Sequence, residues 1–216
     1  MEAAGNLLRK QLQAIAVEPR EELIASLEIF IKELFHWNST INLTAIRSIP
    51  EAIEKHIIDS LTLLPFLPHG TKLLDAGSGA GFPGIPLKIW RPDLTVFSVE
   101  ASGKKVYFQR EVVRKLKIHD FYPLPFRLEN LDSAYPDMPL VDAVVSRALG
   151  RAQDLARLTA KYLRVGGTLL LMKGAEGEQE VASWQERGTG FYLENIHQLT
   201  LPDSGTPRKI LIFRKG

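Results

Sequence analysis

The glycine-rich segment between Leu73 and Gly84 holds the residues that are best suited to chemistry in this sequence. An apolar run leads to an acid at Asp75, and glycines follow at alternate positions, Gly77, Gly79 and Gly81. Glycine lets the backbone turn tightly and lie against a ligand, where a side chain would be in the way. Because an apolar helical pattern comes next, the segment predicts a strand, a ligand-binding loop and a helix, in preference to a turn that binds nothing.

Two kinds of cofactor could use this loop. Residues 79–84 match the G-x-G-x-x-G pattern of dinucleotide-binding proteins, which leaves an NAD(P)-dependent oxidoreductase open. The Asp75 carboxylate instead suits the cationic amino-acid end of S-adenosylmethionine and would repel a pyrophosphate. Glu100 ends the next predicted strand, where such folds hydrogen-bond the hydroxyls of a ribose. The dinucleotide pattern also begins late relative to the strand, so the residues favour S-adenosylmethionine.

The pattern of apolar residues predicts the elements that position this loop. Helical spacing is seen at 23–35, 53–64, 102–117 and 151–163, and short apolar runs at 72–76, 94–99, 141–146 and 168–172 indicate strands buried on both faces. Two further strands, 195–201 and 209–214, flank a turn and predict an antiparallel hairpin. We therefore expect an α/β fold with a mostly parallel sheet at 70–216, and a helical segment at 1–69 packed on it.

Composition sets wider limits. The chain has 216 residues, 45% hydrophobic and 24% charged, which is ordinary for a globular domain. It has no cysteine, so disulfides and thiolate metal sites are excluded. No apolar run is long enough to span a bilayer and the first residues lack a signal-peptide core, so we expect a cytoplasmic protein with no membrane partner. The net charge of +2 permits an anionic partner without indicating one.

Several segments together resemble one family, the small-subunit rRNA guanine-N7 methyltransferases, RsmG, also called glucose-inhibited division protein B. The segments are Trp37-Asn38, Asn42-Leu43-Thr44, His56-Ile57-Ile58-Asp59-Ser60, Asp75 to Leu87, Ser102-Gly103-Lys104-Lys105, Val145-Ser146-Arg147-Ala148 and Met172-Lys173-Gly174. The resemblance implies a Rossmann-like class I S-adenosylmethionine-dependent methyltransferase. It also implies a substrate, a guanine in the 530 loop of 16S rRNA as free RNA or in the small ribosomal subunit, and a monomeric enzyme.

The same resemblance implies the cofactor contacts. They fall on Gly77, Phe82, Glu100, Ala101, Ser102, Leu128, Glu129 and Arg147. The sequence departs from the family at two of these positions, because the family commonly has Asp where Glu100 stands and a small residue where Leu128 stands. These departures change the reach of the acid and the contact with the adenine.

Basic and polar residues elsewhere have more than one interpretation. Arg147 and Lys173 end predicted strands at the carboxyl edge of the sheet, where such folds bind ligands. We favour a positioning role for Arg147 over a surface salt bridge, whereas Lys173 fits an RNA phosphate contact and a solvated side chain equally well. His56 and Asp59 lie on one helical face, where a contact between helices and a role near the ligand are both open, as they are for Asn42 and Thr44. No third ligand accompanies His56 and Asp59, so no metal is expected.

A run of basic residues follows Ser102. Its members are Lys104, Lys105, Arg110, Arg114, Lys115 and Lys117. A solvated helix face explains such a run more simply than an RNA footprint does. If the run does bind RNA, the affinity must fall steeply with salt.

Transfer of a methyl group to guanine N7 needs no general base, because N7 carries an in-plane lone pair and no proton. The protein has to hold the two reacting atoms together. We therefore predict no acid–base catalyst, and we take Arg147, His56 and Lys173 as candidates for positioning. A methyltransferase with another substrate, an NAD(P)-dependent oxidoreductase and a catalytically silent RNA-binding module stay open as alternatives.

Overall fold

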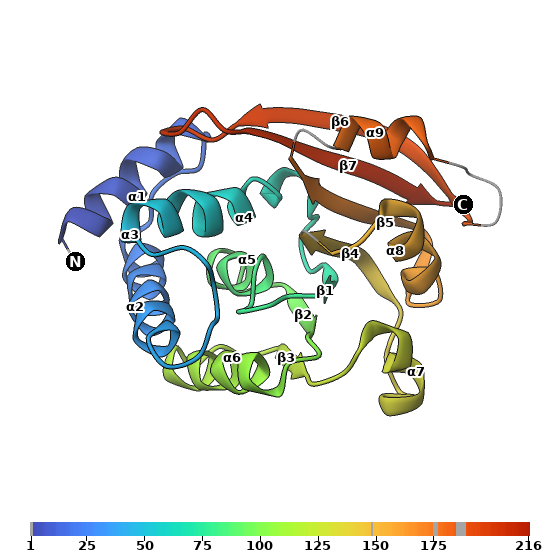
Figure 1. The fold of residues 1–216 in the computed structure, drawn as a ribbon, viewed down its shortest axis with the longest axis horizontal. Helices are drawn as coiled ribbons and strands as arrows, with labels where there is room; N and C mark the ends of the chain where they lie inside the picture. The colour runs from blue at the N-terminus through green and yellow to red at the C-terminus, as the bar shows by residue number, and fades with distance from the viewer. Residues whose placement is uncertain (1, 148, 175–176, 185–188) are drawn as a thin grey trace.

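The computed structural model describes residues 2–147, 149–174, 177–184 and 189–216, and these form a seven-stranded sheet covered by helices (Figure 1). The strands are β1 (Lys72–Ala76), β2 (Thr95–Val99), β3 (Phe121–Leu124), β4 (Val141–Arg147), β5 (Leu163–Lys173), β6 (Phe191–Thr200) and β7 (Pro207–Lys215). Their order across the sheet is β3-β2-β1-β4-β5-β7-β6. Strands β1 to β5 are parallel, and β7 pairs antiparallel with β5 and β6. The predicted mostly parallel sheet with an antiparallel hairpin is confirmed.

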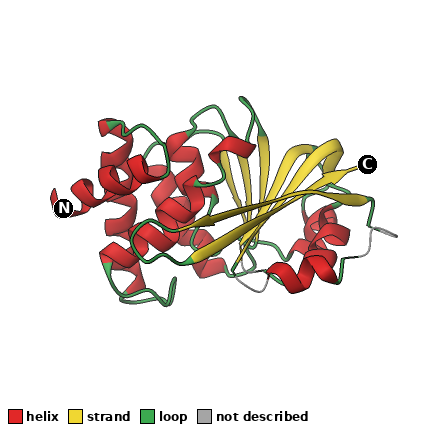
Figure 2. Ribbon diagram, turned by 90° about the horizontal axis from the view of Figure 1, so that it is seen from above, coloured by secondary structure: helices red, strands yellow, loops and turns green. Residues whose placement is uncertain are grey.

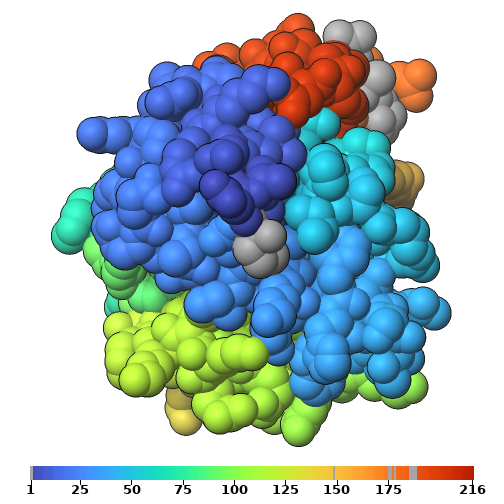
Figure 3. Space-filling view, turned by 90° about the vertical axis from the view of Figure 1, so that its left-hand side faces the viewer, coloured from blue at the N-terminus to red at the C-terminus, as the bar shows by residue number. Residues whose placement is uncertain are grey.

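Helices lie on both faces of the sheet (Figure 2). One face carries α1 (Glu2–Ala14), α2 (Glu21–Asn38), α3 (Ile49–Ala52), a π-helix (Ile53–Ile58), α4 (Asp59–Leu61), α5 (Gly84–Trp90) and α6 (Gly103–Lys115). The other face carries α7 (Leu131–Ala134), α8 (Ala152–Thr159) and α9 (Gly177–Ala182). Short 3-10 turns occupy Leu64–Phe66 and Leu128–Asn130. Figure 3 views the molecule from the side of α1 and α2, which form much of this surface in blue.

Alternate residues of the central strands build two separate apolar cores. In β1, Leu73 packs with α1, α2, α5 and α6, whereas Leu74 packs with α8 on the opposite face. In β4, Val145 and Val144 divide in the same way. Because neighbouring side chains on a strand point to opposite faces, burial on both faces favours apolar residues at adjacent positions. This explains why adjacent residues, and not only alternate ones, are apolar in these strands.

The N-terminal helices share a core with the sheet. The buried residues of α2 include Ile24, Leu27 and Leu34, which is the helical spacing that predicted the element. The buried residues of α1 include Leu8 and Leu12, and they join the same core as the residues of α5. The helical segment is therefore an extension packed on the sheet, and the division at residue 69 stays a prediction.

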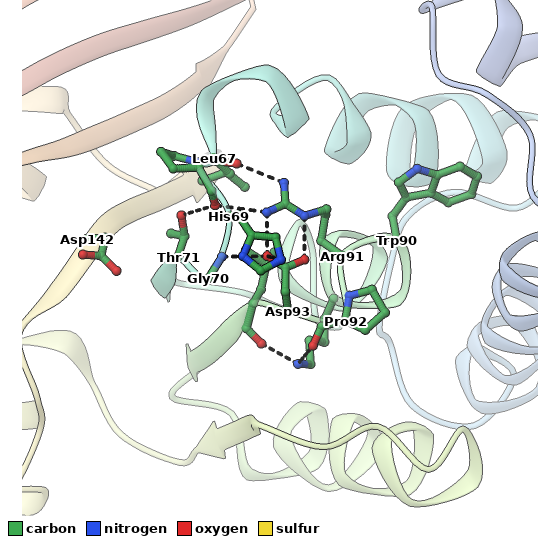
Figure 4. A network of polar contacts seen from close by, with 12 residues as sticks. Leu67, His69, Gly70, Thr71, Trp90, Arg91, Pro92, Asp93 and Asp142 are labelled. Atoms are coloured by element: carbon green, nitrogen blue, oxygen red, sulfur yellow. Dashed lines mark hydrogen bonds and ion pairs between the residues drawn. The ribbon is translucent and has the colours of Figure 1, made fainter.

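The guanidinium of Arg91 fixes the junction between this helical segment and the sheet (Figure 4). Its Nε and Nη2 each donate to Asp93 at 2.6 Å, and Nη1 donates to the carbonyl oxygen of Leu67 at 3.0 Å. The backbone N–H of Gly70 donates to Asp93 Oδ2 at 2.7 Å. These bonds hold the pKa of Asp93 well below its ordinary value. They set where β1 begins, at the edge of the sheet opposite the glycine loop.

Strand β3 is an element that apolar patterning does not identify. It spans Phe121–Leu124, includes Pro123 and pairs only with β2 among the described strands. A proline cannot donate to a neighbouring strand, so it is tolerated at the edge of a sheet. The short length and the proline together hide this strand from periodicity.

Candidate functional site

The glycine loop joins β1 to α5 at the carboxyl edge of the sheet. The backbone N–H groups of Gly77 and Ser78 both donate to the carbonyl oxygen of Val99, at 2.9 and 3.1 Å, so the loop is bonded to the end of β2. Gly77 has φ of 72° and Gly81 has φ of 92°. Residues other than glycine rarely adopt such positive φ values, so the turn depends on glycine at these two positions.

A buried polar triad supports the loop from below. Nε2 of Gln109, on α6, donates to Ser78 Oγ at 2.9 Å and to the carbonyl oxygen of Gly79 at 2.8 Å. Ser98 Oγ lies 2.7 Å from Ser78 Oγ and 2.8 Å from Gln109 Oε1. The three side chains can satisfy one another in a closed ring, which fixes the loop without exposing a polar group to an apolar core.

Asp75 lies beneath the loop and is fully buried. Its Oδ2 accepts the backbone N–H of Gly84 at 2.8 Å, whereas its Oδ1 has no hydrogen-bond partner among the described residues. Burial raises the pKa of Asp75 to about 7. A Cβ at Gly84 would stand 2.6 Å from Asp75 Oδ2, so Gly84 has to be glycine for the carboxylate to reach its N–H. The sequence pattern does not reveal this role of Gly84.

The carboxylate of Glu100 accepts two backbone hydrogen bonds, one from the glycine loop and one from the residues that follow β2. Its Oε2 accepts the N–H of Gly79 at 2.9 Å, and its Oε1 accepts the N–H of Ser102 at 2.7 Å. Each carboxylate oxygen can accept a second hydrogen bond. The side chain is therefore held in one orientation and keeps acceptor capacity for a pair of hydroxyl groups.

A cavity of about 300 Å³ opens between the glycine loop and the end of β2. Its lining is Gly77, Val99, Glu100, Ala101, Phe126, Arg127, Leu128, Glu129, Leu149, Gly150, Asp154, Leu155 and Leu158. The structure thus brings together five of the predicted cofactor residues, Gly77, Glu100, Ala101, Leu128 and Glu129. Leu128 is buried and Glu129 exposed, so the Leu128-Glu129 pair gives this wall one apolar and one acidic member.

The remaining predicted cofactor residues are not among the described lining of this cavity. Asp75 is beneath the loop, Gly79 donates its N–H to Glu100 of the cavity wall, Gly81 faces Ile85 of α5, and Ser102 lines another hollow. Phe82 is buried against α2, with its ring 5.2 Å from that of Phe30.

Leu149 covers Gly77 at the mouth of the cavity. A Cβ at Gly77 would stand 2.7 Å from Leu149 Cδ2, and Leu149 is 36% exposed. Ala148, part of the motif that ends β4, lies outside the described residues. Leu149 gives the cavity an apolar wall that sequence reasoning missed, because nothing in a single sequence distinguishes it from an ordinary loop leucine.

Phe82, His56 and Arg147 form a stack beside the loop. The imidazole of His56 stacks on the Phe82 ring with 4.4 Å between centroids, and the Arg147 guanidinium lies 5.1 Å from the centroid of that ring. Nη1 of Arg147 donates to His56 Nδ1 at 3.1 Å and to the carbonyl oxygen of Lys55 at 2.8 Å. The Arg147 side chain is only 21% exposed, so this is not the surface salt bridge that was the alternative.

His56 is neutral at physiological pH. Burial, together with the charge of Arg147, lowers its pKa to about 3. Arg147 can only donate, so Nδ1 of His56 is the acceptor and Nε2 carries the hydrogen, which it donates to Thr44 Oγ1 at 2.8 Å. His56 lies in the π-helix, an irregularity that is common at functional sites.

The N-L-T and H-x-x-D-S segments meet at this stack. Asn38 Oδ1 accepts the N–H groups of Leu43 and Thr44 at 2.8 and 3.0 Å, which folds the loop after α2. Asp59 lies 3.8 Å from Arg147 and 3.2 Å from Arg208 of β7. A chain of polar contacts therefore runs from α2 through Arg147 to the C-terminal hairpin.

The two interpretations of Lys173, an RNA phosphate contact and a solvated side chain, both assume an exposed side chain, and this assumption is wrong. Lys173 is buried, and its Nζ lies 2.8 Å from Glu180 and donates to the carbonyl oxygen of Gly150 at 2.9 Å. Glu180 also accepts the N–H of Ala152 at the start of α8. Lys173 therefore holds the loop that forms one wall of the cavity, and Glu180 is its partner.

The basic run after Ser102 is divided by its partners. Arg114 pairs with Glu111 at 2.8 Å, and Lys115 pairs with Glu33 at 2.6 Å, so this part is a solvated, ion-paired helix face. Lys104 and Lys105 have no ion pair among the described residues.

The described residues contain no helix that is long and apolar enough to cross a membrane, and no group of three His, Cys, Asp or Glu side chains placed to hold a metal ion.

The cavity residues fit S-adenosylmethionine. Glu100 has acceptors for a ribose, Ala101 and Leu128 offer an apolar wall to an adenine, and the unpartnered Oδ1 of Asp75 leaves a negative group without a donor beneath the loop. An ammonium group, or a water molecule that it orders, can supply that donor. Dinucleotide-binding sheets have the parallel order 3-2-1-4-5-6, and the antiparallel β7 between β5 and β6 departs from it.

This fold and loop define a Rossmann-like S-adenosylmethionine-dependent methyltransferase. A SAM-dependent methyltransferase from Aquifex aeolicus has the same fold, with TM-score 0.57, 16% identity, and 76% of this chain and 93% of that chain covered. The family model described as rRNA small subunit methyltransferase G matches residues 23–211. The chain belongs to this family.

Relatives in this family match along nearly the whole chain. Ribosomal RNA small subunit methyltransferase G of Syntrophotalea carbinolica is 39% identical over 212 residues, with 97% of each chain covered. The protein of the same name from Geobacter sp. strain M21 is 36% identical over 218 residues, with 100% of each covered. The resemblance seen in the sequence and the prediction of an S-adenosylmethionine-dependent rRNA methyltransferase are confirmed at the level of the family.

Proposed function

We propose that this protein transfers a methyl group from S-adenosylmethionine to N7 of a guanine in 16S rRNA, guanine 527 by the family resemblance. The observation that carries the proposal is the cavity between Gly77 and Glu100 in a chain of the rRNA small subunit methyltransferase G family. We further propose that the protein acts as a cytoplasmic monomer on free rRNA or on the small ribosomal subunit.

The residues of the cavity hold the cofactor. Glu100, already oriented by Gly79 and Ser102, accepts the ribose hydroxyls, while Leu128 covers the adenine. Asp75 provides negative charge beneath the cationic end of the cofactor. When bound, S-adenosylmethionine supplies an electrophilic methyl group on its sulfonium.

The stack beside the loop positions the guanine. Guanine N7 needs no deprotonation, and the neutral His56 with its pKa of about 3 is in no state to act as a general acid at neutral pH. In the described part of the chain only Nη1 of Arg147 makes hydrogen bonds, so its Nε and Nη2 are available to a guanine O6 next to the reacting N7. Holding the reacting atoms in place can supply about 7–11 kcal/mol.

Mass spectrometry of rRNA nucleosides from cells with and without this gene tests the proposal. Loss of one 7-methylguanosine from 16S rRNA is the expected result, and an unchanged nucleoside profile would overturn it. Calorimetry should show binding of adenosylhomocysteine and none of NAD, which separates the methyltransferase from the oxidoreductase. Tritiated methyl transfer to unmodified 16S rRNA then separates the enzyme from a silent RNA-binding module.

A further inference from the structure

A second hollow, of about 270 Å³, lies between the loop after α2 and the first turn of α6. Its lining is Thr40, Ile41, Asn42, Leu43, Ser102, Lys104 and Lys105, and we call it the α2–α6 groove. Figure 1 shows the loop from α2 beside α6, and Figure 3 shows blue and yellow-green segments meeting on this side. We propose that the α2–α6 groove binds the backbone of the single-stranded rRNA segment that carries the target guanine, an inference that rests on the proposed function.

The charge of the groove fits an anionic backbone. Lys104 is exposed and Lys105 half-buried, and neither has an acidic partner among the described residues. The lining includes no carboxylate, and Asn42 is exposed, with an amide that can donate to phosphate oxygens. Arg114 and Lys115, at the end of α6, pair with acids, whereas the two lysines of its first turn do not in the described part of the chain.

An aromatic pair at the border of the groove favours unpaired RNA over a duplex. Tyr107 is 55% exposed and lies one helical turn after Lys104, on the same side of α6. Its ring is 5.6 Å from that of Trp37, and the carbonyl oxygen of Trp37 accepts the N–H groups of Thr40 and Ile41, which line the groove. Unstacked bases of RNA loops stack on such rings, whereas bases within a duplex cannot reach them.

The groove adjoins the cofactor cavity. Glu100 and Ala101 line the cavity, and the next residue, Ser102, lines the groove and donates its N–H to Glu100. The opposite wall ends at Leu43, and the next residue, Thr44, accepts a hydrogen bond from His56 and so connects with Arg147. An RNA strand held in the groove therefore lies next to the cofactor cavity, with only the turn after β2 between them.

The test compares two double variants in methyl transfer to small ribosomal subunits isolated without the modification. Lys104→Gln with Lys105→Gln removes two charges from the groove, and Lys32→Gln with Lys72→Gln removes two exposed lysines that do not line it. Each phosphate contact to a single strand contributes about 0.7 to the slope of log affinity against log salt, so the groove variant should lower that slope by about 1.4. At 0.1 M salt the loss of these two contacts should make the KM of the groove variant about 25-fold higher than that of wild type.

In the groove variant, kcat and the affinity for adenosylhomocysteine should stay within about twofold of wild type, since the cofactor cavity is intact. The control variant should match wild type in KM and in salt slope. Tyr107→Ala should raise KM about tenfold without changing the salt slope, because stacking carries no counterion release.

The outcomes separate the inference from the proposed function. If wild type methylates the subunits and the groove variant has the KM and salt slope of the control, the groove does not bind RNA. If the groove variant loses adenosylhomocysteine affinity in parallel with KM, the lysines serve the cofactor site and the inference is wrong. If wild type transfers no methyl group to the subunits, the proposed function itself fails.

Discussion

Asp75→Asn is the substitution that most directly tests the physical reasoning about the cofactor site. The Asp75 carboxylate is fully buried, its pKa is raised to about 7 by burial, and its Oδ1 has no partner among the described residues. At neutral pH and above, the folded protein without cofactor therefore has to carry a buried charge. We expect Asp75→Asn to stabilise the protein there and to weaken cofactor binding.

The size of the effect follows from the two pKa values. Unfolding returns the pKa of Asp75 from about 7 to the ordinary value of 3.8. Between these two pH values the folded state therefore binds more protons than the unfolded state. The free energy of unfolding therefore falls as pH rises from about 4 to about 7. A pKa difference of about 3, at about 1.36 kcal/mol for each pKa unit, gives a total loss of about 4 kcal/mol in the free energy of unfolding. The amide that Asp75→Asn introduces does not titrate, so the variant lacks this loss.

Urea unfolding from pH 4.5 to 8.5 measures the difference between wild type and Asp75→Asn. The gap should open by several kcal/mol in favour of the variant as pH rises, and it should stop growing above about pH 7. Asp137→Asn, the same change at an exposed residue, should show no such gap. Parallel curves for wild type and Asp75→Asn would show that burial does not raise the pKa of this carboxyl.

Cofactor binding should have the opposite pH dependence. The ammonium group of the ligand favours the ionised carboxylate, so adenosylhomocysteine affinity of wild type should fall by up to about tenfold per pH unit below pH 7. In Asp75→Asn the affinity should be weak at every pH and flat across this range. An Asp75→Asn protein that binds as tightly as wild type at pH 8 would remove the carboxylate from the site.

Three further substitutions have defined outcomes. Arg147→Ala should abolish most methyl transfer while melting only a few degrees lower, because Arg208 still pairs with Asp59; full activity would remove Arg147 from the site. Lys173→Met should cost about 1–3 kcal/mol and weaken adenosylhomocysteine binding, since Gly150 loses its bond to Nζ; unchanged affinity would show that the loop holds its own position. Asp93→Asn should lower the free energy of unfolding by about 2 kcal/mol at pH 7. Because the pKa of Asp93 is lowered in the folded state, this difference from wild type should shrink as pH falls below the ordinary value of 3.8. A difference independent of pH would contradict the charged contact with Arg91.

The sheet and the glycine loop could be predicted from the sequence because local pattern determines them. The runs at 72–76 and 141–146 are short and mostly apolar with adjacent buried residues, as expected for strands buried on both faces, and Gly77 and Gly81 need a backbone that other residues rarely adopt. The family resemblance, in turn, selected Leu128 and Glu129, which no local pattern singles out.

Contacts between distant segments could not be predicted in this way. Gln109 carried the one available signal, a polar residue at a buried helical position beside Val106 and Val112, yet its partner Ser98 lies on another element. Lys173 stands at the strand end that usually meets ligands, and only the position of Glu180 shows that its charge is already paired. Spacing along a chain gives the face of an element, and it does not give what the next element places against that face.

The place of β7 between β5 and β6 has a consequence for synthesis of the protein. Residues 207–215 are made after both of the strands they join, so β6 has no partner among the described strands until they arrive. A growing chain that has not yet released this segment from the ribosomal exit tunnel presents the free edges of β5 and β6 to its surroundings. Such edges bind other extended chains readily. Chaperone binding and aggregation of this protein should therefore be concentrated in the short interval before Lys215 emerges.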